Sequence, residues 1–91
     1  MDIDTRIRWQ AFVDEFSLNK TGANPWDAGL LDANSAGASH GERLTISFLL
    51  NVWDGTTEWK VGKFDCIEAI ATWSQEQRAA FADWARNPWW P

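Results

Sequence analysis

Cysteine, histidine and tyrosine are nearly or entirely absent from this chain, and their scarcity excludes several kinds of site. The sequence contains one Cys, one His and no Tyr. A single Cys cannot form a disulfide within the chain, and Cys66 together with His40 cannot complete the ligand set of a structural zinc ion. We therefore expect no metal site, and no motif indicates a bound cofactor.

Positive charge and long apolar runs are scarce as well. Eight Lys and Arg stand against 13 Asp and Glu, which gives a formal net charge of −5 at pH 7. Nucleic acids and anionic membranes are bound by clustered basic residues, so we expect neither as a partner. No run approaches the roughly 18 apolar residues of a membrane span, and residues 1–6 are charged where a signal peptide would be apolar. A cytoplasmic location is therefore expected, and the acidic balance either suits a basic protein partner or serves solubility alone.

Tryptophan, in contrast, is abundant, with eight residues in a chain of 91. A chain of this length forms one small domain with one core, so we expect a single domain spanning residues 1–91. That core is too small to enclose eight indoles, and several Trp side chains should therefore be partly exposed.

Residues 42–64 are predicted to form an antiparallel β-hairpin. An apolar residue stands at every second position of the first half, at Leu44, Ile46, Phe48, Leu50 and Val52. This is the period of a strand with one buried face. Asp54-Gly55 is a typical hairpin turn, and Trp59 and Val61 on the returning arm would share the buried face.

A helix is predicted on the N-terminal side of this hairpin, over residues 4–17. Asp4 or Thr5 is placed to cap its first turn. Its apolar stripe has helical spacing and consists of Ile7, Trp9, Phe12, Val13 and Phe16.

Two further helices are predicted after the hairpin. Asp65 with Glu68 predicts a short helix through Trp73, with an apolar face formed by Ile67, Ile70 and Ala71. Ser74 and Gln77 then form a capping box for a helix through Arg86, which Asn87-Pro88 ends. Its apolar stripe is formed by Gln77, Phe81, Trp84 and Ala85.

Residues 18–41 lack periodicity and are punctuated by Gly and by Asn24-Pro25, so a long loop is predicted. Within it, residues 26–33 are a candidate for a short strand or a helical turn around Leu30 and Leu31. The expected fold class is therefore α+β: an N-terminal helix, a long loop with or without a short extra strand, the hairpin, and two C-terminal helices packed on one sheet face.

Three short patterns resemble functional motifs, and each lacks a part that the chemistry needs. Residues 37–41 match the nucleophile elbow G-x-S-x-G, but a loop precedes them and the only His directly follows Ser39. Residues 32–37 resemble the start of an EF-hand loop, but Ala36 and Arg43 stand where ligands are required. Cys66 has no His placed to activate it. We therefore expect no catalytic residue and no enzyme activity.

Four Trp side chains are the candidate binding residues. Trp26 lies in the predicted loop, Trp53 on the hairpin face opposite Leu50, and Trp89 and Trp90 beyond the last helix. Aromatic residues among polar ones anchor protein interfaces, and they also form platforms on which sugars stack. Alternatively, the C-terminal tail folds back as a lid over the core.

These features together predict a non-enzymatic, acidic interaction module that binds another protein through exposed Trp and carboxylates, such as an accessory inhibitor or adaptor. The alternative is a small-molecule or carbohydrate binder with a Trp-lined pocket between hairpin and loop. An unpaired hairpin edge is a template for pairing, so we also expect a homodimer.

Overall fold

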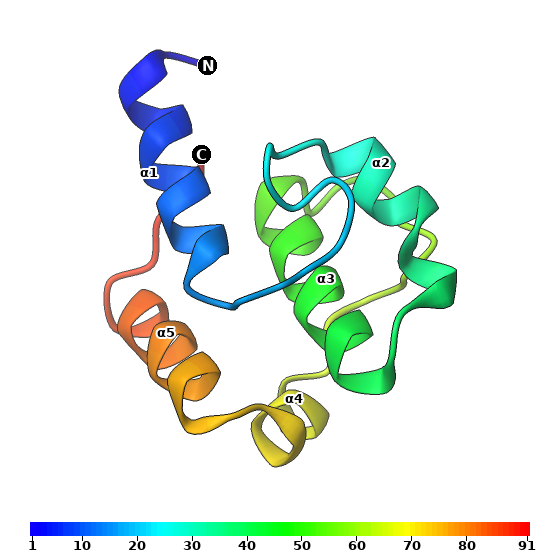
Figure 1. Cartoon of the computed structure of the whole chain (residues 1–91). Coiled ribbons are helices and arrows are strands. Elements are labelled where there is room, and N and C mark those ends of the chain that lie inside the picture. The colour runs from blue at the N-terminus through cyan, green and yellow to red at the C-terminus, as the bar shows by residue number, and fades with distance from the viewer.

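The computed structural model describes all residues, 1–91, and consists of helices without any β-strand (Figure 1). The α+β prediction is therefore wrong, and the homodimer prediction loses the strand edge on which it was based. No helix combines the length and the hydrophobicity that crossing a membrane requires. In chain order the elements are α1 (Ile3–Asp14), α2 (Ala28–Ala33), the short 3-10 helix η1 (Ser35–Gly37), α3 (His40–Trp53), α4 (Cys66–Thr72) and α5 (Gln75–Arg86).

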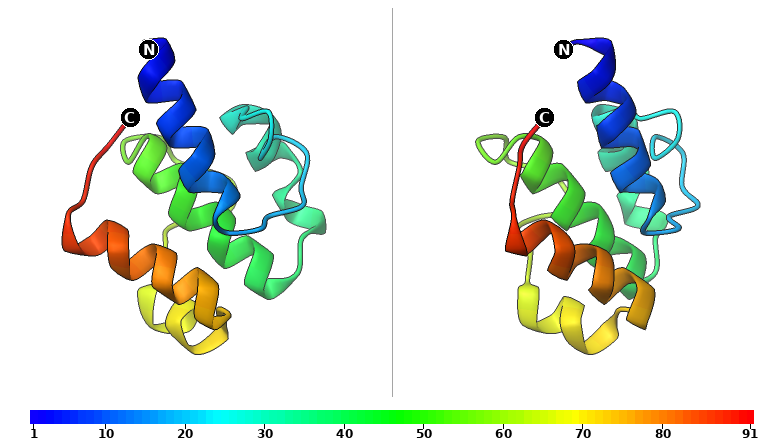
Figure 2. Two further views of the ribbon diagram at one scale, coloured as in Figure 1. Left: turned by 60° about the vertical axis from the view of Figure 1, so that its left-hand side comes forward. Right: turned by 90° about the vertical axis from the view of Figure 1, so that its left-hand side faces the viewer.

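Helix α3 is the central element, and the other helices are arranged around it. Figure 2 shows α1 and α5 lying alongside α3, with α4 at one end of the molecule. The C-terminal tail returns from α5 toward the beginning of α1, so both termini lie at the same end.

The predicted hairpin is a helix in its first half because its start is capped and its residues are buried on all sides. The Ser39 hydroxyl accepts a hydrogen bond from the Glu42 N–H, and the Glu42 carboxylate accepts one from the Ser39 N–H, which is a complete capping box. Eight residues of α3 are buried: Leu44, Thr45, Ile46, Ser47, Phe48, Leu49, Leu50 and Val52. A helix that is surrounded by protein needs no polar face. Apolar residues at alternate positions therefore do not distinguish such a helix from a strand.

The second half of the predicted hairpin is a loop that joins α3 to α4. Asp54 does not start a hairpin turn, because its carboxylate accepts hydrogen bonds from the N–H and hydroxyl of Thr56 instead. Trp59 and Val61 are half-buried and pack against the core. The loop is held in place by Asp32, whose carboxylate oxygens accept the backbone N–H groups of Lys60 and Val61 at 3.0 and 3.1 Å.

Most of the apolar stripe predicted for the first helix is confirmed. Trp9, Phe12, Val13 and Phe16 are all buried. Ile7 was wrongly assigned to this stripe, because it points to the solvent side of α1. The helix also begins earlier than expected, since Asp2 caps it by accepting the Thr5 N–H at 2.8 Å.

Helix α4 is present, but the prediction of its buried face is wrong. Ile67 and Ile70 are exposed, and Ala69 is the residue that packs inward. The core space next to α4 is filled by Trp73, whose indole N–H donates to the hydroxyl of Thr45 on α3 at 2.9 Å. A small residue such as Ala69 is what this close approach of α4 to the core requires.

Of the two alternatives predicted for residues 26–33, a short strand or a helical turn, the segment between α1 and α3 contains the helical one. Asp27 caps the two-turn helix α2 by accepting the Leu30 N–H, and Leu31 of α2 is fully buried. Ser35 begins the short helix η1, which leads into the cap of α3.

The capping box predicted for the last helix is confirmed. The Ser74 hydroxyl accepts the Gln77 N–H, and the Gln77 side chain accepts the Ser74 N–H. Gln77 also donates to the carbonyl of Phe16 at the end of α1 at 3.0 Å. Of the predicted stripe on α5, Phe81 and Trp84 are half-buried, whereas Ala85 is exposed and Ala80 is buried in its place.

Replacing Ser74 with alanine is expected to destabilise the protein by about 1 kcal/mol, because the first turn of α5 loses its hydroxyl acceptor. Urea denaturation followed by tryptophan fluorescence measures the change. Gln75→Ala is a matched control in the same exposed turn, and it should leave the midpoint within experimental error. Equal midpoints for the two variants would show that the cap contributes nothing.

Candidate binding groove

Trp26 and Trp53, two of the four candidate residues, lie beside one another although they are far apart in the sequence. Their ring centroids are 5.3 Å apart. Trp26 precedes α2, and Trp53 is the last residue of α3. Both pack against Trp9 of α1, whose centroid lies 5.2 Å from that of Trp26 and 5.7 Å from that of Trp53. Three separate segments thus contribute to one indole cluster.

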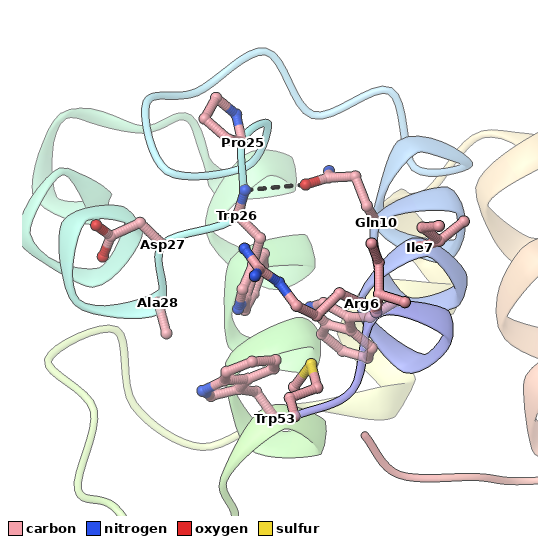
Figure 3. Close-up of a pocket in the computed structure, with 11 residues that line it drawn as sticks. Arg6, Ile7, Gln10, Pro25, Trp26, Asp27, Ala28 and Trp53 are labelled. Carbon is pink, nitrogen blue, oxygen red and sulfur yellow. Dashed lines mark hydrogen bonds between the residues drawn. The ribbon is translucent and has the colours of Figure 1, made fainter.

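An open groove of about 710 Å³ lies beside this cluster. The first half of α1 forms one side, and residues 25–28 together with Trp53 form the other. Figure 3 shows the side chains of Gln10 and Arg6 extending from α1 toward Trp26, with Ile7 at the outer edge of α1.

Gln10 positions the far side of the groove relative to α1. Its side-chain oxygen accepts the backbone N–H of Trp26 at 2.9 Å (Figure 3). Its side-chain nitrogen donates to the carbonyl of Ala23 at 2.8 Å. These two bonds hold the non-helical segment before α2 against α1. Nothing in the spacing of the sequence indicates this role, because Gln10 lies next to the apolar stripe of a helix and resembles an ordinary surface residue.

The groove contains buried polar atoms that have no partner. The indole nitrogens of Trp9 and Trp26 are buried and make no hydrogen bond, and they are the only such side-chain atoms in the protein. Both indoles line the groove. Arg6, which also lines it, takes part in no ion pair and in no side-chain hydrogen bond within the protein.

Two carboxylates belong to residues that are next in the sequence to residues of the groove. Asp2 adjoins two residues that line it, and Asp54 directly follows Trp53. The backbone N–H of Thr5, and then its hydroxyl, lower the pKa of Asp2. The hydroxyls of Thr56 and Thr57 lower the pKa of Asp54. Both carboxylates are therefore ionised at neutral pH and place negative charge beside an apolar surface.

Three large apolar side chains form the rim of the groove at and before the start of α1. Met1, Ile3 and Ile7 are 61%, 72% and 63% exposed. They were missed as candidate binding residues, although a signal exists: Ile3 and Ile7 are one helical turn apart and fall outside the face that contains Trp9, Phe12 and Phe16. An amphipathic helix with apolar residues on its outer face has a second surface to cover.

The structure places the other two candidate residues, Trp89 and Trp90, away from this groove. Trp89 packs on Phe12 and Trp9, and the guanidinium of Arg8 lies 3.7 Å from its ring centroid. The Trp84 indole donates to the Trp89 carbonyl at 2.8 Å, so this part of the tail is fastened to the core as a strap. Trp90 is 62% exposed and contacts Trp84.

The other residues that the sequence offered for catalysis or metal binding do not form a site. Ser39 caps α3, as described above, and no three His, Cys, Asp or Glu side chains are grouped to hold a metal ion. Comparison with family models, curated proteins and solved structures finds no match for this chain. The groove must therefore be interpreted from its own geometry.

Proposed function

We propose that this protein is a non-enzymatic binding module that engages another protein through the groove between α1 and residues 25–28. The observation that carries the proposal is the exposed aliphatic rim of Met1, Ile3 and Ile7 next to the indole cluster. Trp, Met and Arg are enriched in the buried centres of protein interfaces, and each of them lines this groove.

A protein partner suits the rim better than a small ligand does. A small molecule seated in the groove would cover its floor but would leave the protruding Ile3 and Ile7 in water. A protein surface can cover rim and floor together, and burying an exposed Ile side chain contributes about 1.5–3 kcal/mol. The ionised Asp2 and Asp54 beside the groove favour a partner with basic residues around its apolar contact. We place this interaction in the cytoplasm, where Cys66 stays a free thiol.

A small-molecule or carbohydrate ligand is the second candidate, and the size of the groove favours it. A volume of about 710 Å³ lies within the range of known ligand pockets. Such a ligand would bind mainly to the indoles of Trp26 and Trp53, and substitutions on the rim would affect it little.

The proposal is tested by replacing Ile7 with aspartate, which puts a charge on the rim without disturbing the core. The wild-type protein is immobilised, proteins of the source organism are captured, and the retained protein is purified for affinity measurements. We expect Ile7→Asp to weaken the purified complex by roughly tenfold or more, because the Ile contact is lost and a charge is desolvated.

Ile67→Asp is the matched control, since Ile67 is also solvent-exposed but lies on α4, outside the lining of the groove. It should bind the partner as the wild type does. Equal affinity of Ile7→Asp and wild type would contradict the proposed surface. A small molecule that is retained by both rim variants and lost from Trp53→Ala would instead support the second candidate.

A further inference from the structure

We infer that the partner segment entering the groove presents a neutral hydrogen-bond acceptor, such as an unpaired peptide carbonyl, next to its apolar side chain. This inference rests on the proposed function, since it specifies the chemistry of what the groove receives. It follows from the kind of polar group that the groove leaves without a partner.

Three donors of the groove lack a partner, and two of them are buried. They are the indole N–H groups of Trp9 and Trp26 and the guanidinium of Arg6. Two acceptors of the groove already hold a donor of the protein: the Gln10 oxygen accepts the N–H of Trp26, and one oxygen of the Asp27 carboxylate accepts the N–H of Leu30. An acceptor that entered the groove would therefore find several donors without a partner.

The two indole N–H groups are unfavourable as they stand. A buried donor without a partner has lost its hydration and gained nothing in exchange. Trp9 and Trp26 meet edge to face, with 84° between their ring planes, and an N–H directed at an aromatic face is only a weak substitute for a hydrogen bond. Since this protein buries no other unpartnered side-chain donor or acceptor, their concentration at the groove indicates a site completed by another molecule.

Trp26 is the group that can bring its donor to a ligand. It stands before α2, outside any helix, and its side chain is only half-buried. Its ring packs on Trp9 and Trp53, so its N–H reaches a ligand only if the ring rotates within this cluster, a change that breaks no helical hydrogen bond. Trp9, by contrast, is fixed in α1 and almost completely buried.

The acceptor is neutral because the surroundings are acidic. Asp2 and Asp54 are ionised beside the groove, and the whole chain has a formal net charge of −5. A carboxylate entering the groove would gain Arg6 as a partner but would be repelled by these charges. A carbonyl oxygen can accept an indole N–H without this repulsion.

The inference is tested with two small probes that differ by one carbonyl group, 1-indanone and indane. Binding of each is followed by ¹H–¹⁵N NMR, in which the eight Trp indoles report individually. We expect 1-indanone to shift the Trp26 indole proton downfield, as a new hydrogen bond does, and indane to shift groove signals without this displacement. Loss of one neutral hydrogen bond changes affinity roughly two- to tenfold, so Trp26→Phe should lower the preference for 1-indanone over indane by that factor.

Trp53→Phe is the matched control, because it removes an indole of the same groove whose N–H is not among the buried unpartnered donors. It should leave the preference between the two probes unchanged. Equal preferences in wild type and Trp26→Phe, or a groove that binds neither probe, would overturn the inference. The proposed function would survive that result if the purified partner still depended on Ile7, so the two failures are distinguishable.

Discussion

Replacing Phe48 with alanine is expected to destabilise the protein by about 3–5 kcal/mol, the largest effect of any substitution considered for this fold. Phe48 lies in the middle of α3 and is almost completely buried. Six aromatic rings surround it, with centroids between 5.1 and 6.1 Å from its own: Phe12, Phe16, Phe64, Trp73, Phe81 and Trp84.

The size of the effect follows from what these six rings do. They come from α1 and its end, from the loop before α4, from the end of α4 and from α5. A cavity at Phe48 therefore weakens the contact of every one of these segments with α3. Small domains have free energies of unfolding of only about 5–15 kcal/mol, so the variant should be largely or partly unfolded at room temperature.

Urea denaturation and near-ultraviolet circular dichroism of Phe48→Ala measure this loss. Phe48→Leu keeps most of the buried volume and should lose markedly less stability than Phe48→Ala. Ile67→Ala, at a side chain that is 77% exposed, should change the free energy of unfolding by less than about 0.5 kcal/mol. A Phe48→Ala protein with the wild-type midpoint would show that α3 is not the centre of the core.

Replacing Gly22 with alanine should destabilise the protein by roughly 3 kcal/mol, because the backbone there has no room for a side chain. Gly22 has a φ of +100°, which L side chains rarely adopt. A Cβ atom at this position would lie 2.5 Å from the nitrogen of Leu31 and 2.8 Å from the carbonyl oxygen of Asp27. These are backbone atoms of α2 and its cap, so they can give way only if α2 moves.

The consequence for the groove is as important as the loss of stability. Gly22 accepts the backbone N–H of Asp27 at 2.8 Å, which closes the turn that carries Trp26. Moving α2 would displace Trp26 from Trp53, and the variant should therefore also lose partner binding at temperatures where it is still folded. Thermal unfolding and the affinity for the purified partner measure the two effects.

Gly37→Ala is the control for this substitution. Gly37 belongs to η1, and a Cβ atom there would meet nothing within 4 Å. It should be neutral or slightly stabilising, since alanine restricts the unfolded chain more than glycine does. Equal stability of Gly22→Ala and Gly37→Ala would contradict the close contact between Gly22 and α2.

The starts of α4 and α5 and most of the buried face of α1 were determined by the sequence alone, because these features depend on neighbouring residues. Ser74 and Gln77 satisfy one another's backbone groups whatever surrounds them, and Asp65 caps α4 in the same local way. Trp9, Phe12 and Phe16 show helical spacing between polar residues, so the period is visible without knowledge of the rest of the molecule.

Only the tertiary structure decided the conformation of α3 and the existence of the groove. Alternation at Leu44, Ile46 and Phe48 agrees with a strand when one face is exposed, but α3 is covered on every side by segments from both ends of the chain. The residues between them, Thr45 and Ser47, are polar but buried. Their hydroxyls can be buried because they donate to helix carbonyls, so these positions do not mark a face exposed to solvent. The groove likewise needs Gln10 to bring Trp26 to α1, a contact between residues of different elements. Burial from all sides and contacts between distant elements arise only when the chain is folded, and they leave no period in the sequence from which they can be inferred.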